Sequence, residues 1–247
     1  MSGFAPNVIY KMLQPVRNRR IDNGTAGVPP QSIVIPNATY SPWLADSEFL
    51  QDDLQIRRHT MVDIYRRYEL ARLVRQTSKV PGDILEVGVW RGGTGCLMAL
   101  CARRIGSAAT VFLCDTFAGV VKAGDKDFEY KGGEFANTDA EMVQGLLAAT
   151  SLSNVRILPG IFPDETGAQI AERKFSLCHI DVDVYLSAKD TFDWVWPKLS
   201  IGGVVVFDDY GFAGCRGVTT FGNECSSIKN GVFVHNLNGH ALFIKIA

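Results

Sequence analysis

The sequence predicts an α/β protein with a mostly parallel seven-stranded sheet, helices on both faces and an antiparallel hairpin at the C-terminal end. Short β-branched runs alternate with helical patterns in the order DILEVGV, TVFLCD, VRILPG, FSLCHIDVD and GGVVVFDD. Such alternation is typical of a parallel sheet whose strands are connected by helices. The final segment, GVFVHNLNGHALFIKIA, holds two apolar runs separated by Asn238-Gly239. That residue pair favours a tight hairpin turn.

Two segments precede this alternation. Residues 1–50 are rich in Pro, Gly, Asn and Ser and show little periodicity, which predicts an irregular N-terminal arm. From Asp52 to Gln76, apolar residues recur at helical spacing between arginines. This spacing predicts one amphipathic helix packed on the main domain. Residues 51–247 are expected to form a single domain, because one hydrophobic core can fill a chain of that length.

A long polar connection separates the second and third predicted strands. It includes VVKAGDKDFEYKGGEFANTD and extends over about residues 117–140. Connections between neighbouring elements are usually much shorter, so this segment predicts a lid over a binding site. The alternative is a mobile surface insertion followed by a helix from Glu141 to Ala149.

The composition favours a small-molecule partner over nucleic acid. Lys and Arg total 25 against 26 Asp and Glu, and the formal net charge is −1, so the basic footprint of a nucleic-acid-binding protein is absent. No apolar run is long enough to cross a membrane, and the first residues lack the apolar stretch of a signal peptide. A soluble, cytoplasmic protein is therefore expected. The six cysteines lack zinc-ligand spacing, which predicts reduced packing thiols.

The segment ILEVGVWRGGTGCLMALCARR has the strand, turn and helix order of a nucleotide-binding loop. Gly88, Gly92 and Gly93 stand where a backbone turns tightly and approaches a ligand. Glu86 replaces the first glycine of the dinucleotide pattern; its carboxylate would repel a pyrophosphate but suits the ammonium and sulfonium of S-adenosylmethionine. Asp115 ends the next strand, where it can accept hydrogen bonds from the ribose of either cofactor. The loop favours the methyl donor over NAD, and a tight turn without ligand is the alternative.

Four carboxylates end two of the predicted strands. Asp181 and Asp183 share one face of their strand, and Asp208 and Asp209 close GGVVVFDD. If these strands are parallel neighbours, the acids meet at the ligand-binding edge, where oxygen ligands indicate Mg²⁺. Coordination would lower the pKa of an acceptor hydroxyl while one acid removes its proton, so that the oxygen attacks the sulfonium methyl directly. Aspartates as ordinary turn formers are the alternative.

With these motifs in order, residues 40–247 resemble the macrocin O-methyltransferase (TylF-type) family, whose metal-dependent members methylate sugar hydroxyls of natural products. The resemblance lies in HTMVDIYRRYEL, PGDILEVGVWRGGTG, CDTFAGV, LPGIFPDET and HIDVDVYLSAKDTFDWVWPKLSIGGVVVFDDYG. It implies a Rossmann-like class I methyltransferase fold. By resemblance, the metal ligands are Asp181, Asp208 and Asp209, and Asp183 is the general base. The resemblance also implies a donor site built from Glu86, Gly88, Gly92, Gly93, Asp115, Thr60, Met61, Gly160, Ile161 and Phe162.

Two departures from the family pattern concern the acceptor. Val182 replaces the usual glycine between the two motif acids, and the lid lacks the proline that commonly follows its first residues. The acceptor is therefore expected to be a small hydroxylated molecule, foremost a deoxysugar on a secondary metabolite, with a catechol or other diol as the alternative. An NAD-dependent oxidoreductase and a non-catalytic nucleoside-binding protein are further alternatives. The resemblance and the arm together favour a homo-oligomer.

Two histidines near these motifs are predicted to be structural. His179 shares its strand face with the acids Asp181 and Asp183, yet a strand histidine in an apolar run is more often buried and hydrogen-bonded than a ligand. His240 flanks the terminal hairpin turn and is interpreted in the same way.

Overall fold

The chain divides into two compact units, Met1–Ala45 and Asp46–Ala247. The computed structural model describes residues 19–21, 31–33 and 40–247. In the first unit, strands β1 (Arg19–Ile21) and β2 (Gln31–Ile33) pair antiparallel, and a short 3-10 helix, η2 (Pro42–Ala45), ends the unit. Most of the predicted irregular arm lies outside the described residues. Within the described part of the arm, β1 and β2 form a strand pair, and α2 begins at Ser47.

The second unit is built on a seven-stranded sheet with the order β5-β4-β3-β6-β7-β9-β8. The strands are β3 (Asp83–Val87), β4 (Val111–Asp115), β5 (Val155–Pro159), β6 (Phe175–Ile180), β7 (Leu199–Phe207), β8 (Gly231–His235) and β9 (Ala241–Lys245). The first five are parallel, whereas β9 runs antiparallel to both of its neighbours. This arrangement confirms the predicted parallel sheet and its C-terminal hairpin.

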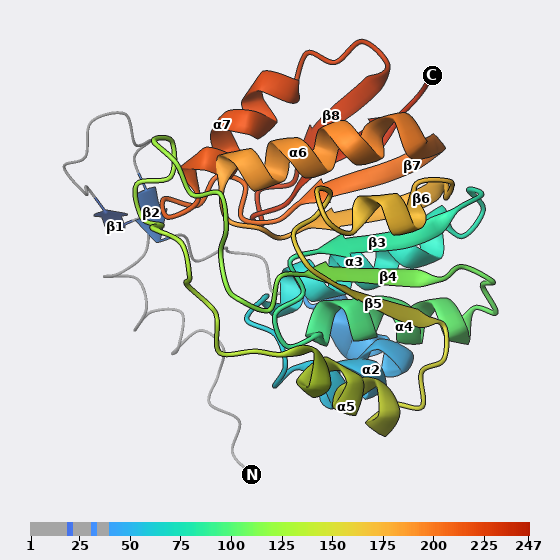
Figure 1. Ribbon diagram of the computed structural model, residues 1–247. Coiled ribbons are helices and arrows are strands. Elements are labelled where there is room, and N and C mark those ends of the chain that lie inside the picture. The colour runs from blue at the N-terminus through green and yellow to red at the C-terminus, as the bar shows by residue number, and fades with distance from the viewer. Residues whose placement is uncertain (1–18, 22–30, 34–39) are drawn as a thin grey trace. The chain divides into compact units, whose positions relative to one another are not determined.

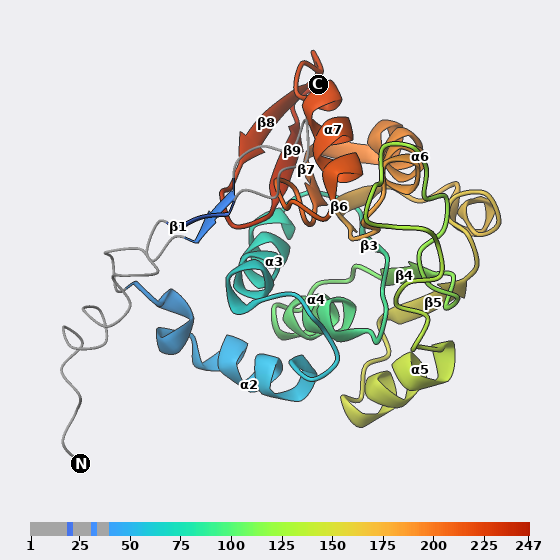
Figure 2. The ribbon, with the colours of Figure 1, turned by 90° about the vertical axis from the view of Figure 1, so that its left-hand side faces the viewer.

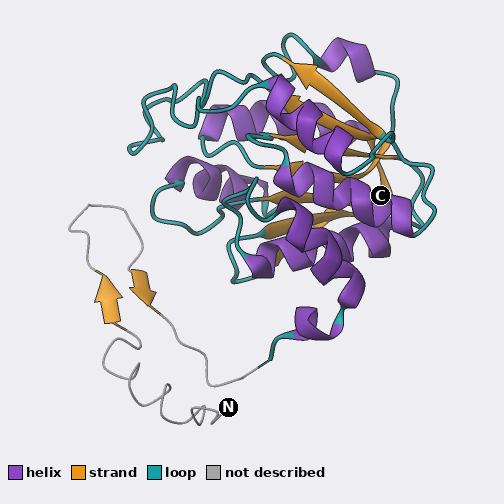
Figure 3. Cartoon of the chain, turned by 90° about the horizontal axis from the view of Figure 1, so that it is seen from below, coloured by secondary structure: helices purple, strands orange, loops and turns teal. Residues whose placement is uncertain are grey.

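Helices cover both faces of this sheet. One face carries α2 (Ser47–Ile56), α3 (Ile64–Thr77), α4 (Gly93–Arg104) and α5 (Ala140–Ala149), and the other carries α6 (Tyr185–Val195) and α7 (Arg216–Cys225) (Figures 1 and 2). Short 3-10 helices, η3 (Gly167–Ile170) and η4 (Trp196–Lys198), complete the second face. Seen from below in Figure 3, the strands form one layer behind the helices. The fully buried residues Leu85, Phe112 and Phe175 belong to this central layer. They lie on β3, β4 and β6, respectively.

The prediction of a single helix between Asp52 and Gln76 is wrong, because α2 and α3 are separate helices. Asp63 begins α3 by accepting hydrogen bonds from the amides of Tyr65 (2.8 Å) and Arg66 (3.2 Å). An aspartate in that position satisfies amides that would otherwise lack partners, and it competes with a continuous helix. The intervening residues 57–63 are thereby free to turn toward the end of β3.

The strand register gathers the carboxyl ends of three strands. Val87 of β3 pairs with Ile180 of β6, and Ile180 pairs with Phe207 of β7. The amide of Asp181 donates to Val87 (2.9 Å), and the amide of Asp208 donates to Ile180 (2.9 Å). The residues that follow these strands therefore lie side by side, as expected from the sequence. Residues 116–139, all described, contain no helix or strand and follow β4 at the same edge (Figure 1).

Candidate active site

A cavity of about 400 Å³ opens at this edge of the sheet. It lies beyond the ends of β3, β4, β6 and β7, the position at which open α/β sheets bind ligands. Nine of the residues predicted for the site line it: Thr60, Met61, Gly88, Asp115, Gly160, Phe162, Asp181, Asp183 and Asp209. The fold thus brings the predicted donor loop and most of the predicted carboxylates to one wall.

The loop after β3 forms the first half of this cavity, which we call the donor side. Gly88 has φ +87°, and a Cβ at this position would lie 1.7 Å from the carbonyl oxygen of Asp181. Only glycine allows the loop to pass this closely. Asp115 Oδ2 accepts the amides of Val89 (2.6 Å) and Trp90 (2.8 Å), and Oδ1 accepts that of Phe117 (2.7 Å). Asp115 therefore shapes the loop as well as bordering the cavity.

Four residues predicted to bind the donor do not line the cavity. Glu86 is fully buried and accepts a hydrogen bond from the ring of His179 (2.9 Å). Gly93 donates its amide to the carbonyl of His59 (3.0 Å), and a Cβ there would lie 2.7 Å from that oxygen. Gly92, with φ +85°, begins α4, and Ile161 donates its amide to Glu165 (2.8 Å). The glycines thus let the His59–Thr60 turn approach the loop, which places Thr60 and Met61 on the wall.

Three carboxylates converge at the ends of β6 and β7. Single oxygens of Asp181, Asp208 and Asp209 lie within 4.8 Å of one another. Asp208 is buried below the cavity wall, and the other two are partly buried. Burial and the charges of Asp208 and Asp209 raise the pKa of Asp181 well above its ordinary value, and burial with the charges of Asp208 and Asp183 raises the pKa of Asp209 to about 7. Negative charge is therefore in excess at this point.

Arg66 contacts two of these acids, which the sequence did not predict. Its Nη1 atom donates to Oδ1 of Asp208 and to Oδ1 of Asp209 (2.8 Å), and its Nε atom donates to Asp63 (2.8 Å). Although burial disfavours the charged form, Asp208 and Asp209 raise the pKa of Arg66, so it remains a cation. Arg66 thus neutralises part of the charge that a metal ion would otherwise meet.

The donor set nevertheless fits a hard divalent cation. Three carboxylates offer the oxygen ligands that Mg²⁺ prefers. Arg66 contacts Oδ1 of Asp208 and Oδ1 of Asp209, whereas it makes no ion pair with Asp181. A cation held by all three acids would therefore share two of its ligand residues with Arg66.

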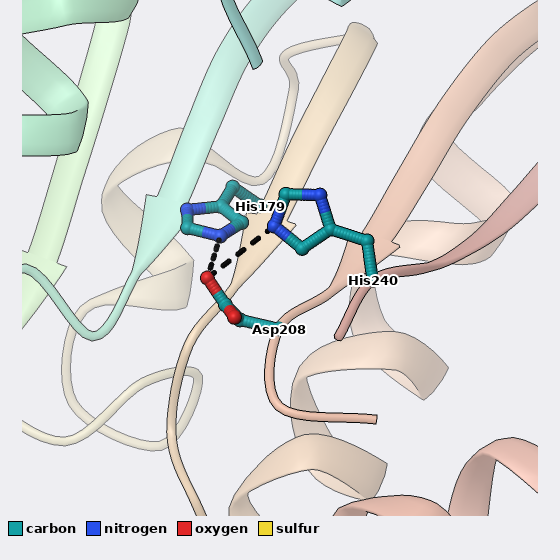
Figure 4. A group of neighbouring side chains, drawn as sticks. All are labelled: His179, Asp208 and His240. Atoms are coloured by element: carbon teal, nitrogen blue, oxygen red, sulfur yellow. Dashed lines mark hydrogen bonds and ion pairs between the residues drawn. The ribbon is translucent and has the colours of Figure 1, made fainter. Parts of the chain in front are cut away.

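Two buried histidines contact Asp208 (Figure 4). The Nε2 atoms of His179 (3.1 Å) and His240 (3.4 Å) both face Oδ2 of Asp208. The opposite ring nitrogens face Glu86 (2.9 Å) and Glu69 (2.6 Å), respectively. Burial disfavours the imidazolium, but hydrogen bonds to Asp208 and Glu86 outweigh it and raise the pKa of His179 to about 10. The prediction of a buried, hydrogen-bonded His179 is confirmed.

The opposite half of the cavity, which we call the acceptor side, surrounds Asp183. The hydroxyl of Tyr130 donates to Oδ1 of Asp183 (2.7 Å), and the thiol of Cys215 lies 3.6 Å from the same oxygen. Val120, Val121, Phe135 and Phe212 also line this part of the molecule. The acceptor side therefore combines one carboxylate with largely apolar walls.

Sequence reasoning missed Arg66, Tyr130 and Cys215 as site residues. Arg66 was counted among the polar residues of a longer helix, and the Asp63 cap alone could have indicated its true place in a first helical turn. Tyr130 lies in a polar segment without periodicity, which carries no signal. Cys215 is buried as predicted for a packing thiol, yet it also borders the cavity.

Comparison with known proteins identifies the fold and the family. The macrocin O-methyltransferase (TylF) family model matches residues 43–238. The solved structure of the O-methyltransferase NovP is 27% identical and superposes with a TM-score of 0.67, covering 76% of this chain and 83% of that one. The calicheamicin methyltransferase CalS11 shares the fold, with 17% identity, a TM-score of 0.62, and coverage of 87% of this chain and 98% of that one.

Curated relatives carry the same chemistry in their names. The 8-demethyl-8-(2,3-dimethoxy-alpha-L-rhamnosyl)-tetracenomycin-C 4'-O-methyltransferase of Streptomyces olivaceus is 32% identical over 184 residues, which are 70% of each chain. The mycinamicin III 3''-O-methyltransferase of Micromonospora griseorubida is 32% identical over 183 residues, which are 67% of this chain and 70% of that protein. None of the helices among the described residues is long and apolar enough to cross a membrane. The chain belongs to the macrocin O-methyltransferase (TylF) family and is an O-methyltransferase of the S-adenosylmethionine-dependent class.

Proposed function

We propose that this protein transfers the methyl group of S-adenosylmethionine to a sugar hydroxyl of a natural product, with Mg²⁺ as its metal ion. The observation that carries this proposal is a single cavity in which the glycine loop at Gly88 and Asp115 faces the carboxylates Asp181, Asp183 and Asp209. A methyl donor on one side and a group that activates an alcohol on the other are what O-methylation requires.

The donor side suits the nucleoside part of S-adenosylmethionine. Asp115 keeps acceptor capacity for ribose hydroxyls because each carboxylate oxygen has two lone-pair sites, and its three amide contacts do not fill them. Thr60, Met61, Gly160 and Phe162 supply the remaining wall. Glu86 acts from beneath the loop, through His179, in place of the direct contact expected from its position in the motif.

Asp181, Asp208 and Asp209 would hold the metal, with Asp208 oriented by the two histidines below it. A divalent ion bound there would lower the pKa of an acceptor hydroxyl and compensate the carboxylate charge. Arg66 limits the repulsion among the acids when they meet without an ion.

Asp183 is the base in this proposal. It borders the cavity beyond Asp181, and burial raises its pKa above the ordinary value, which improves a carboxylate as a proton acceptor near neutral pH. The acceptor oxygen forms a bond to the methyl carbon as the carbon–sulfur bond breaks. The proton of the hydroxyl passes to Asp183, and S-adenosylhomocysteine leaves.

The proposed acceptor is a glycoside, because one curated relative is named as the O-methyltransferase of a rhamnosyl-tetracenomycin. The apolar side chains Val120, Val121, Phe135 and Phe212 supply contacts for a deoxysugar and the scaffold that carries it. Residues 117–140 are proposed as the lid of this side. Association into a homo-oligomer stays a prediction, which light scattering of the purified chain would test.

Methyl transfer from radiolabelled S-adenosylmethionine tests the function. The acceptors are mycinamicin III, 8-demethyl-8-(2,3-dimethoxy-alpha-L-rhamnosyl)-tetracenomycin-C and catechol, each with Mg²⁺ and with EDTA. We expect a labelled glycoside product that EDTA abolishes and Mg²⁺ restores. Activity on catechol alone would show that the acceptor is a diol other than a sugar. Activity unaffected by EDTA would contradict the proposed metal dependence. Failure to bind S-adenosylhomocysteine in calorimetry would contradict the donor site.

A further inference from the structure

The side chain of Tyr130, in the segment 116–139, contacts the proposed base Asp183. Its hydroxyl lies 2.7 Å from Oδ1 of Asp183 and 3.6 Å from the sulfur of Cys215. The ring packs against the buried core and lies 6.3 Å from the ring of Phe135, centroid to centroid. Tyr130 is therefore held on three sides, and its hydroxyl points at one carboxylate oxygen.

The backbone around Tyr130 is fixed by contacts to the helices on the α6 face. Asp127 accepts the first amide of α6, that of Tyr185 (2.8 Å), and also the amide of Gly124 (3.0 Å). A Cβ added to Gly217 would lie only 1.8 Å from Oδ1 of Asp127. Helix α7 therefore approaches Asp127 closely at this glycine. The amide of Tyr130 donates to the carbonyl of Asp127 (3.2 Å). These bonds set the place of Tyr130 independently of any ligand.

Asp183 has an unusual backbone that makes its side-chain direction depend on such contacts. It has φ +63°, the left-handed region that residues with a Cβ rarely adopt. The strained turn is over-determined by its surroundings, a feature that clusters at functional sites. Tyr130 and Cys215 both donate to Oδ1, at 2.7 Å and 3.6 Å. One oxygen of the carboxylate is thus engaged by the protein.

We propose that Tyr130 is a positioning residue, which holds Oδ1 of Asp183 so that the other oxygen faces the acceptor hydroxyl. This inference rests on the proposed function and extends it, because it makes the segment 116–139 part of the catalytic arrangement. The hydroxyl remains a donor throughout, since burial and the charge of Asp183 raise the pKa of Tyr130 above its ordinary value.

The replacement Tyr130→Phe removes the hydroxyl and keeps the ring that packs against the core. Hydrogen bonds to charged groups are strong enough that we expect kcat to fall about ten- to a hundredfold. The KM for S-adenosylmethionine and the affinity for S-adenosylhomocysteine should stay within about twofold of wild type, because the donor side is untouched. A crystal structure of the variant should show the Asp183 carboxylate rotated from its wild-type direction.

Tyr185→Phe is the matched control. The Tyr185 hydroxyl also donates to a carboxylate, Glu224 (2.7 Å), but neither residue lines the cavity. This variant should keep the wild-type kcat and the wild-type direction of Asp183.

The outcomes separate this inference from the proposed function. If the wild type methylates an acceptor and Tyr130→Phe has the same kcat, the inference is wrong. It is also wrong if donor affinity and kcat fall together, because Tyr130 would then be part of the wall alone. If the wild type is inactive on every acceptor, the proposed function fails, while an unmoved carboxylate in the Tyr130→Phe crystal structure still refutes, and a rotated one still supports, the positioning role.

Discussion

The donor side of the cavity is shaped mainly by backbone groups, whereas the acceptor side is shaped mainly by side chains. On the donor side, backbone groups and one carboxylate decide the shape: Gly88 turns at the end of β3, and Asp115 holds the amides of Val89 and Trp90. On the acceptor side, Asp183 meets Tyr130 from the segment after β4 and Cys215 from the start of α7. The turn at Gly88 and Asp115 is local to two neighbouring strands, whereas the contacts of Asp183 join segments far apart in the chain.

This contrast separates a shape set by the backbone from a chemistry set by side chains. A loop whose shape is set by a glycine turn and by amide hydrogen bonds keeps that shape when neighbouring side chains change. Walls made of side chains on a long connection change by substitution without disturbing the sheet. Changes on the donor side should therefore act on donor affinity and folding, and changes on the acceptor side should act on turnover and selectivity.

The largest expected effect is that of Asp183→Asn, which tests the acceptor side at its centre. Loss of the proposed base should lower kcat by about a hundred- to ten-thousandfold, the range typical of general bases. Affinity for S-adenosylhomocysteine, measured by calorimetry, should not change. Asp193→Asn on the exposed face of α6, where Asp193 pairs with Lys189, is the control and should retain full activity. Turnover of Asp183→Asn within about twofold of wild type would assign the proton to another group.

Gly88→Ala tests the donor side. The added Cβ would overlap the carbonyl of Asp181, and the positive φ adds strain. We expect a loss of more than about 3 kcal/mol in the free energy of unfolding, measured with urea, together with loss of donor binding. Gly106→Ala separates the two causes, because Gly106 also has positive φ (+66°) but has no atoms within 4 Å of its added Cβ. It should cost only about 1 kcal/mol, and equal losses in both variants would remove the close approach from the explanation.

The proposed metal joins the two sides, and its effect on stability depends on pH. Asp209 has its pKa raised from 3.8 to about 7, and that of Asp181 is also raised. Between pH 3.8 and about 7, the folded chain therefore binds more protons than the unfolded chain. The free energy of unfolding without metal should fall as pH rises through this range.

Mg²⁺ should reverse this loss. At about a hundred times its Kd it should stabilise the protein by about 3 kcal/mol near pH 8, and by less near pH 5, where Asp181 and Asp209 retain protons. Urea unfolding with Mg²⁺ and with EDTA at both values measures the difference. Identical curves at pH 8 would exclude the metal site without reference to activity.

The smallest expected effect is that of Val182→Gly, which restores the residue usual for the family. Val182 lines the cavity between Asp181 and Asp183 and lies against Gly88. Its removal should widen the acceptor side and change the ratio of kcat/KM between a bulky and a small acceptor by about tenfold. The KM for the donor should remain the same. A change confined to the donor would place Val182 on the other side of the cavity.

The strand pattern determined more of this site than the helix pattern did. Short runs of β-branched and other apolar residues located β3, β4, β6 and β7. The residues at or near their ends, among them Gly88, Asp115, Asp181 and Asp209, line one cavity. The helical spacing around Arg66 was misjudged because apolar residues kept their period across residues 57–63. The cap at Asp63 interrupts the helix there, and the turn it allows carries Thr60 and Met61 to the cavity.

Glu86 shows that its position in a sequence motif did not determine which residues it contacts. Its place before the glycine loop predicted contact with the donor, but it is fully buried beneath the loop and bonded to His179. Strand side chains alternate between faces, and the packing of α4 over β3 decides which face is open. Gly95 of α4 lies directly against Glu86, so a Cβ there would be 2.5 Å from Glu86 Oε2.

The sequence by itself determined the parallel sheet, its terminal hairpin and the strand ends that border the cavity. These features follow from short-range rules: side-chain alternation, turn residues and the convergence of parallel strands at one edge. Only the tertiary structure decided that Arg66 meets Asp208 and Asp209 and that Tyr130 meets Asp183. Those contacts join segments separated by 142, 143 and 53 positions along the chain, respectively. Their formation depends on how every intervening element packs, which no local pattern specifies.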